Sequence, residues 1–118
     1  MKRGEIWTVS GGRDYASKPR PVVILQDDSF EATDSVTVCG LTTDLRDALI
    51  MRIPIPPTDE NGLRSESRIM VDKITTVDRR KLGVRIGQLS PSDVLRINQA
   101  VLVFLGVAAS SRAGREPH

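Results

Sequence analysis

The chain has 118 residues and a net charge of +2, and only 3% of its residues are aromatic. This length predicts one domain with a single core, filled by valine, isoleucine and leucine because so few aromatic residues are present. The lone cysteine, Cys39, excludes an internal disulfide framework, and no segment approaches the about 20 apolar residues of a membrane helix. We therefore expect a cytoplasmic protein that has no membrane partner.

Short strands are predicted along most of the chain, because apolar and β-branched residues recur with the period of a strand. The expected strands cover residues 5–10, 21–26, 35–42, 49–55, 68–77 and 84–89. The second of them is apolar throughout, which predicts a central strand covered on both faces. Pro54 places the end of the fourth at a sheet edge. Asn61-Gly62 is the strongest turn signal, and residues 78–83 predict a turn or a single helical turn.

The periodicity becomes helical after the last strand. Ser90 is placed as the N-cap, Pro91 as the first helical residue and Asp93 as the acid of a capping box. Apolar residues then recur at helical spacing, and Gly106 is placed to end the helix. We predict a helix over about 91–105, packed against a small, partly open barrel. The single domain spans residues 1–108, and residues 109–118 form a polar, flexible tail.

Two basic segments lie far apart in the sequence, at residues 1–20 and 79–85, whereas residues 27–47 are acidic. If the basic segments meet in space, they form a patch for an anion; otherwise they make a solvated charged face. The small net charge alone is weak evidence for nucleic acid binding.

The histidine and cysteine content excludes several kinds of catalysis. His118, the only histidine, is the last residue, so mechanisms that need imidazole or a transition metal are excluded, and we expect no metal and no cofactor. The groups that remain suit RNA cleavage, in which the 2′-hydroxyl attacks its own phosphodiester. The protein then needs only to position the phosphate, stabilise charge on its oxygens and manage protons.

Arg20 lies between Pro19 and Pro21, directly before an apolar strand. Because proline fixes its own φ and holds the preceding residue extended, Arg20 leaves a rigid backbone. Its planar guanidinium reaches two phosphate oxygens at once and stays charged. Arg20 is therefore the best-placed candidate for phosphate stabilisation. The alternative is an exposed loop arginine between two incidental prolines.

Six segments, in this order, resemble the MazF/PemK family of toxin endoribonucleases. They are "KRGEIW" (2–7), "RPVVIL" (20–25), "GLTTD" (40–44), "NGLRSES" (61–67), "VDKITTVDRRKLG" (71–83) and "IGQLS" (86–90). The resemblance implies an SH3-like barrel with a C-terminal helix, of the MazF/CcdB-like type. It also implies a homodimeric, metal-independent ribonuclease that cuts single-stranded mRNA at short sequences, and a cognate antitoxin of the MazE type whose acidic tail covers the RNA groove.

The resemblance also assigns roles to particular residues. Arg20 matches the family's catalytic arginine, and Thr42 matches a hydroxyl residue at a strand end that donates to a phosphate oxygen. Thr43 is the register alternative, and without the resemblance Thr42 reads equally well as a strand cap. Asp72 falls where some members place an acidic base. Ser67 matches a recurrent serine after the turn at 61–63 and is more often structural.

Asp72 also has a structural interpretation, in which it pairs with Lys73 or Arg68. Some relatives carry a basic residue two positions before the acid, and here that position is Met70. An arginine–aspartate pair acting as acid and base is therefore not expected at this spot, which puts more weight on Arg20. The general base remains open between Asp72, another carboxylate and water.

RNA-binding candidates also include two residues of the loop before Pro19. Tyr15 is the aromatic residue expected to be exposed, since Trp7 and Phe104 are read as core. Beside Lys18 it would stack on an unpaired base, a contact worth ~1–3 kcal/mol, or it would cover an apolar edge. The full set of RNA-binding candidates is Tyr15, Lys18, Thr43, Ser67 and Asp72.

Two rival functions remain open at this level. One is a toxin that poisons DNA gyrase, similar to CcdB, although the residues after the helix do not resemble the helix end of those toxins. The other is a non-catalytic barrel that binds RNA or protein, for which a basic patch would suffice without Arg20. Homodimerisation is implied by the resemblance, and exposed strand residues such as Ile53 and Ile55 would permit it.

Overall fold

The computed structural model describes residues 1–10, 18–46 and 52–109. The strands are β1 (Glu5–Val9), β2 (Arg20–Ile24), β3 (Ser35–Thr42), β4 (Arg52–Ile55), β5 (Ser67–Asp78) and β6 (Leu82–Gln88), and the helix is α1 (Pro91–Phe104). Two short 3-10 turns, η2 (Asp28–Phe30) and η3 (Arg79–Lys81), connect strands. Each predicted strand is present, although residues 49–51 of the fourth lie outside the described residues. The turn or single helical turn expected at 78–83 is η3.

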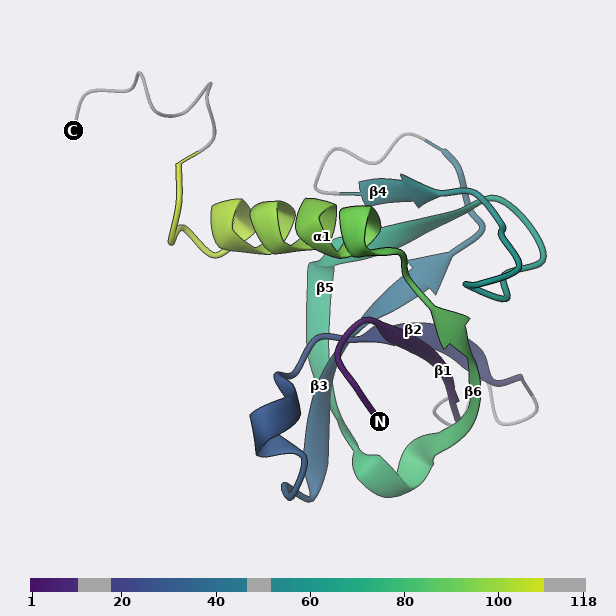
Figure 1. Cartoon of the computed structure of the whole chain (residues 1–118), viewed down its shortest axis with the longest axis vertical. Coiled ribbons are helices and arrows are strands. Elements are labelled where there is room, and N and C mark those ends of the chain that lie inside the picture. Colours follow the sequence, from purple (N-terminus) through teal and green to yellow (C-terminus); the bar gives the residue numbers. More distant parts are fainter. Residues whose placement is uncertain (11–17, 47–51, 110–118) are drawn as a thin grey trace.

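One antiparallel sheet organises this part of the chain, with the strand order β4-β5-β3-β2-β1-β6. The sheet curls into a barrel-like layer that stays open between its edge strands β4 and β6, and α1 lies beside β4 and β5 (Figure 1). The expected mainly-β fold with a C-terminal helix is confirmed. Pro54 lies on edge strand β4, where its missing N–H costs no sheet hydrogen bond.

The central strand β2 is covered on both faces, as its unbroken apolar run predicted. Val23 belongs to a core cluster that also holds Ile97 and Ala100 of α1. Its neighbours Val22 and Ile24 point the other way, into a second cluster. Successive side chains of a strand alternate between faces, so a strand inside two cores must be apolar throughout.

Strand β5 bends sharply where it passes from β3 to β4. Cys39 of β3 pairs with Ile74, but Leu41, only two residues on, pairs with Ile69. The extra residues of β5 form an irregularity around Met70, and such bulges bend a strand and redirect its side chains. Figure 1 shows β5 turning at this point toward β4.

The sequence signals for α1 are confirmed. The Asp93 amide donates to the Ser90 hydroxyl at 3.1 Å, and Pro91 is the first helical residue. The Asp93 carboxylate accepts from Arg96 at 2.9 Å instead of closing the expected capping box. The helix ends at Phe104, and Gly106 takes a φ of +78° just beyond it. No helix within the described ranges is long and apolar enough to cross a membrane.

Several burial predictions are wrong. Ile53 and Ile55 are buried, because β4 is an edge only for hydrogen bonding and one of its faces joins the core cluster beneath α1. Phe104 is 39% exposed, because the last turn of α1 extends beyond the sheet (Figure 1). Phe30, in η2, is a further exposed aromatic residue at 60%. Trp7 packs against the second core cluster, as expected.

We expect Gly87→Ala to destabilise the fold strongly. An added Cβ at Gly87 would lie 2.4 Å from the Glu60 carbonyl oxygen and 2.5 Å from the Asn61 carbonyl carbon, which are backbone atoms. The turn and β6 would have to separate, so the free energy of unfolding should fall by about 2–3 kcal/mol. Urea titration measures this loss. Gly106→Ala is the control: no atom lies within 4 Å of the added carbon, so only its positive φ opposes the change, at ~1 kcal/mol.

Candidate active site

The register of β2 and β3 brings the two strongest site candidates together. Val22 pairs with Gly40, and Ile24 pairs with Val38. Continuing this antiparallel register by two residues sets Arg20 opposite Thr42. Directly opposed residues of antiparallel strands carry their side chains on the same face. The first residue of β2 and the last residue of β3 therefore share one face of the sheet.

Arg20 lies at the start of its strand, as Pro19 and Pro21 predicted. It is the first residue of β2, pairs with Val9 of β1 and is exposed. Its backbone is held from one side by β1, and Pro21 follows it in the same strand. Arg20 is thus an exposed residue on a fixed backbone, where an anionic ligand can reach it.

Thr42 is held by a turn at the end of β3. Its Oγ1 accepts a hydrogen bond from the Asp44 amide at 3.1 Å, which fixes the oxygen and leaves the hydroxyl hydrogen to donate. Thr42 is partly buried and pairs with Arg68 of β5. Thr43, the register alternative, is exposed and lies beyond the strand.

The face that carries Arg20 and Thr42 continues across β5 and β4. On the opposite face, Leu41, Ile69 and Ile53 pair in a row and are buried beneath α1. Successive side chains of a strand alternate between faces, so Thr42 and its partner Arg68 lie on the face turned away from α1.

Arg52 is the functional candidate that the sequence did not reveal. It pairs with Met70 across β4 and β5. Its Nε donates to Asp72 Oδ1 at 2.8 Å, and its Nη2 donates to Oδ2 at 3.2 Å. An arginine–aspartate ion pair is thus present, with its cation supplied by β4. Asp72 has the structural ion pair considered from the sequence, but its partner is Arg52 and not Lys73 or Arg68.

Both members of this pair are largely buried. The Arg52 and Asp72 side chains are 18% and 15% exposed. Hydrogen bonds from Arg52 lower the pKa of the Asp72 carboxyl, although burial acts in the opposite direction. Asp72 is therefore an ionised group whose two oxygens both face the guanidinium.

Cys39 lies under this face and is not a nucleophile candidate. It is fully buried, and its Sγ donates to the Met70 carbonyl at 2.9 Å. Burial, followed by the nearby Asp72 carboxylate, raises the pKa of the thiol to about 12. A thiol that stays protonated at neutral pH is a core side chain.

Comparison with known proteins identifies the family. Residues 2–105 match the family described as PemK-like, MazF-like toxin of type II toxin-antitoxin system. The chain belongs to this toxin family. The probable endoribonuclease MazF of Mycolicibacterium smegmatis is 50% identical over 108 residues, which cover 92% of this chain and 99% of that protein. The predicted membership of the MazF/PemK family is confirmed, and this MazF-type toxin is an enzyme of the endoribonuclease class.

Solved structures agree with this membership. The Mycobacterium tuberculosis toxin MazF-mt6 is 28% identical with a TM-score of 0.71, over 86% of this chain and 96% of that one. A mycobacterial endoribonuclease in complex with its cognate antitoxin has a TM-score of 0.75 at 23% identity, over 93% and 99% of the two chains. The second likeness shows the shared MazF fold.

The remaining predicted residues of the toxin fall into three groups. Ser67 is buried and its Oγ donates to the Ser65 carbonyl at 3.0 Å, which is a structural contact. Lys18 is exposed just before β2. Tyr15 lies outside the described residues.

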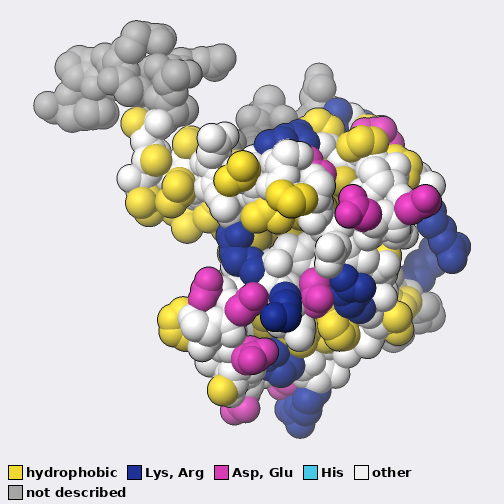
Figure 2. Space-filling model, in the orientation of Figure 1, with side chains coloured by type: hydrophobic (Ala, Val, Ile, Leu, Met, Phe, Trp, Pro, Cys, Tyr) yellow, Lys and Arg dark blue, Asp and Glu magenta, His cyan; other side chains and the backbone are white. Residues whose placement is uncertain are grey.

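The two basic segments of the toxin do meet, because β1 pairs with β6. Two of their arginines form ion pairs, however: Arg85 pairs with Glu5 at 3.0 Å, and Arg80 pairs with Asp78 at 2.9 Å. Figure 2 shows basic and acidic side chains interspersed over the visible face. These contacts favour the solvated charged face over an anion patch.

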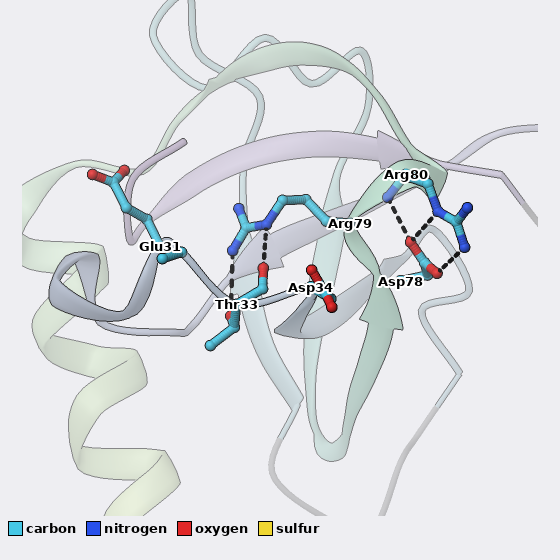
Figure 3. Close-up of a pocket in the computed structure, with 7 residues that line it drawn as sticks. Glu31, Thr33, Asp34, Asp78, Arg79 and Arg80 are labelled. Carbon is cyan, nitrogen blue, oxygen red and sulfur yellow. Dashed lines mark hydrogen bonds and ion pairs between the residues drawn. The ribbon is translucent and has the colours of Figure 1, made fainter.

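A hollow of about 650 Å³ lies beside η3, lined by residues 31–34 and 78–80. Figure 3 shows Arg80 turned toward Asp78 and Arg79 turned toward Thr33, whereas Glu31 points away from them. Arg79 donates to the Thr33 carbonyl at 2.8 Å, and Arg80 grips Asp78 through two nitrogens. Arg79 and Arg80 are engaged within the protein at this hollow. The shared register of Arg20 and Thr42 makes their face the candidate site of the toxin.

Proposed function

We propose that this toxin is a metal-independent, sequence-specific endoribonuclease that cleaves single-stranded mRNA and leaves 2′,3′-cyclic phosphate and 5′-hydroxyl ends. The observation that supports it best is the shared register position of Arg20 and Thr42 at neighbouring strand ends. A guanidinium and a hydroxyl on one face can together stabilise the transition state of a reacting phosphate, the first as a fixed positive charge and the second as a neutral hydrogen-bond donor. The catalytic domain that we propose spans residues 1–108.

The reaction that suits these groups is internal transfer. The 2′-oxygen attacks the adjacent phosphorus, its proton passes to a base, and the bond from phosphorus to the 5′-oxygen breaks as that oxygen gains a proton. Arg20 stabilises the charge on the phosphate oxygens, and Thr42 donates its hydroxyl hydrogen to one of them. Arginine carries its proton at neutral pH and is therefore a poor base. We assign Arg20 the stabilisation of charge and the protonation of the leaving oxygen, and the base is a carboxylate or water.

We also propose a cognate antitoxin of the MazE type as partner, and the cytoplasm, where mRNA is translated, as the site of action. A related mycobacterial endoribonuclease with this fold was solved with its cognate antitoxin, which supports the first point. We propose a homodimer as well. Its support is the set of exposed leucines on α1 and its C-cap, where Leu95, Leu102 and Leu105 are 62%, 42% and 59% exposed.

The test is cleavage without divalent metal. Purified toxin is incubated with a long single-stranded transcript in excess EDTA, and the new ends are mapped and their chemistry determined. We expect discrete cuts at one short sequence with 2′,3′-cyclic phosphate ends, because no step uses a metal. Uncut RNA together with trapped gyrase would support the CcdB-like alternative, and tight RNA binding without cuts would support the non-catalytic barrel.

A further inference from the structure

We propose that Arg52 is a second phosphate-binding guanidinium of this site, for the phosphate beside the one that reacts, and that Asp72 is the positioning residue that aims it. The inference rests on the proposed function and deepens it, because it names how the RNA backbone is held. Three features carry it: a forked ion pair, its place on the Arg20 face and its largely buried setting.

The fork fixes the direction of Arg52. Two parallel N–H···O bonds, at 2.8 and 3.2 Å, engage both oxygens of Asp72. A guanidinium has five N–H groups, so three remain after these two bonds. Because the plane of the group is set by Asp72, the remaining donors point in a constant direction. A phosphate meeting them finds a side chain whose rotamer freedom is already lost.

The register places Arg52 on the correct face. Thr42 pairs with Arg68 of β5, and Arg68 pairs with Pro54, two residues from Arg52 on β4. Two strand spacings separate β3 from β4, which is about 10 Å across the sheet. That separation is too large for Arg52 to share the phosphate bound by Arg20 and Thr42, and it suits a neighbouring phosphate of an RNA strand that runs across the strands.

The charge of Arg52 is felt at the end of β3. The pKa of Asp44 is lowered to about 2, chiefly by hydrogen bonds from Arg46, and the Arg52 charge contributes in the same direction. Asp44 lies two residues beyond Thr42. Arg52 and the Thr42 turn therefore border the same region of the surface, which agrees with the register.

Stability alone does not account for this pair. At 18% and 15% side-chain exposure, both ions have lost much of their water, and that cost offsets most of their attraction. The arrangement also leaves Asp72 a poor proton acceptor, since both of its oxygens already accept from Arg52 and its pKa is lowered. Orientation of Arg52 is the use that remains for Asp72, in place of the general base considered from the sequence.

The test measures RNA binding against salt. The probe is a short RNA that spans a mapped cut, with a 2′-deoxy nucleotide at the attacking position so that it stays intact. Arg52→Gln should weaken binding by about tenfold, since a charge-assisted hydrogen bond is lost. It should also reduce the slope of log K against log[KCl] by ~0.7, the value for one phosphate contact to a single strand. On natural RNA, kcat/KM should fall by a similar factor.

Two further variants separate the orientation of Arg52 by Asp72 from the contribution of the pair to the stability of the fold. Asp72→Asn keeps the charge of Arg52 but loosens its direction, so the salt slope should stay while affinity falls severalfold. Arg52→Gln combined with Asp72→Asn replaces the ion pair by a neutral hydrogen-bonded pair of similar size, which protects the fold. This double variant should keep the wild-type Tm and still lose the salt slope. Arg80→Gln is the matched control: Arg80 also grips an aspartate through two nitrogens, but beside η3, and its loss should change nothing.

The outcomes distinguish this inference from the proposed function. A folded Arg52→Gln or double variant that binds the 2′-deoxy RNA with the wild-type salt slope and affinity would overturn the role of Arg52. RNA cleavage by the wild-type toxin would still support the proposed nuclease function. A slope lost in Asp72→Asn as well would overturn the aiming role of Asp72. Failure of the wild-type toxin to bind or cut any RNA would overturn both.

Discussion

Arg20→Ala is expected to reduce RNA cleavage by at least about 10²-fold in kcat/KM without unfolding the protein. The exposed guanidinium leaves the first residue of β2, where strand pairing with β1 holds its backbone. Its loss removes the fixed charge that stabilises the phosphate oxygens as the 2′-oxygen attacks. Initial rates on a fluorogenic RNA that contains a mapped cut site measure the effect, and circular dichroism confirms the fold.

Two companion variants sharpen this result. Arg20→Lys keeps a charge but not the planar fork, so its rate should fall between those of wild type and Arg20→Ala. Arg80→Ala removes an arginine that is 90% exposed beside η3 and should cut at the wild-type rate. Cleavage by Arg20→Ala at the Arg80→Ala rate would exclude Arg20 from the chemistry.

Thr42→Val is expected to produce the second largest loss, of about tenfold to 10²-fold in kcat. Valine has nearly the shape of threonine but cannot donate to a phosphate oxygen. It also removes the acceptor of the Asp44 amide, so the turn after β3 loses a 3.1 Å hydrogen bond. Single-turnover cleavage at saturating RNA measures the chemical step directly.

The controls for Thr42 come from the chain itself. Thr42→Ser keeps the hydroxyl and should restore most of the rate, which a purely steric role for the methyl group would not allow. Thr43→Val alters the exposed neighbour and should leave kcat unchanged. The opposite pattern, with loss in Thr43→Val and none in Thr42→Val, would assign the donor to the other threonine.

Local signals in the sequence account for the elements but not for their contacts. The apolar run of β2 predicted its two-sided burial, and Ser90 with Pro91 predicted the start of α1, because each signal acts within a few residues. The burial of Ile53 and Ile55 was missed for a physical reason. Proline shows that a strand lacks a hydrogen-bonding neighbour, but it does not show whether a helix covers one of the faces.

The site shows the same division. The two prolines indicate a rigid base for Arg20, whereas its closeness to Thr42 depends on the register of β2 and β3, which no local pattern encodes. The pair of Arg52 and Asp72 joins residues 20 positions apart on different strands. In the sequence, the position two residues before Asp72 is Met70, which carries no charge. Only the pairing of β4 with β5 shows that Arg52 lies directly across from it.

The most direct test of the account is a crystal structure of the toxin with a 2′-deoxy RNA across its cut site. We predict one phosphate within about 3 Å of both the Arg20 guanidinium and the Thr42 hydroxyl, with the 2′-position of the preceding nucleotide aligned behind it. An RNA whose phosphates contact only one of these two side chains, or that lies on another face of the toxin, would contradict the shared site.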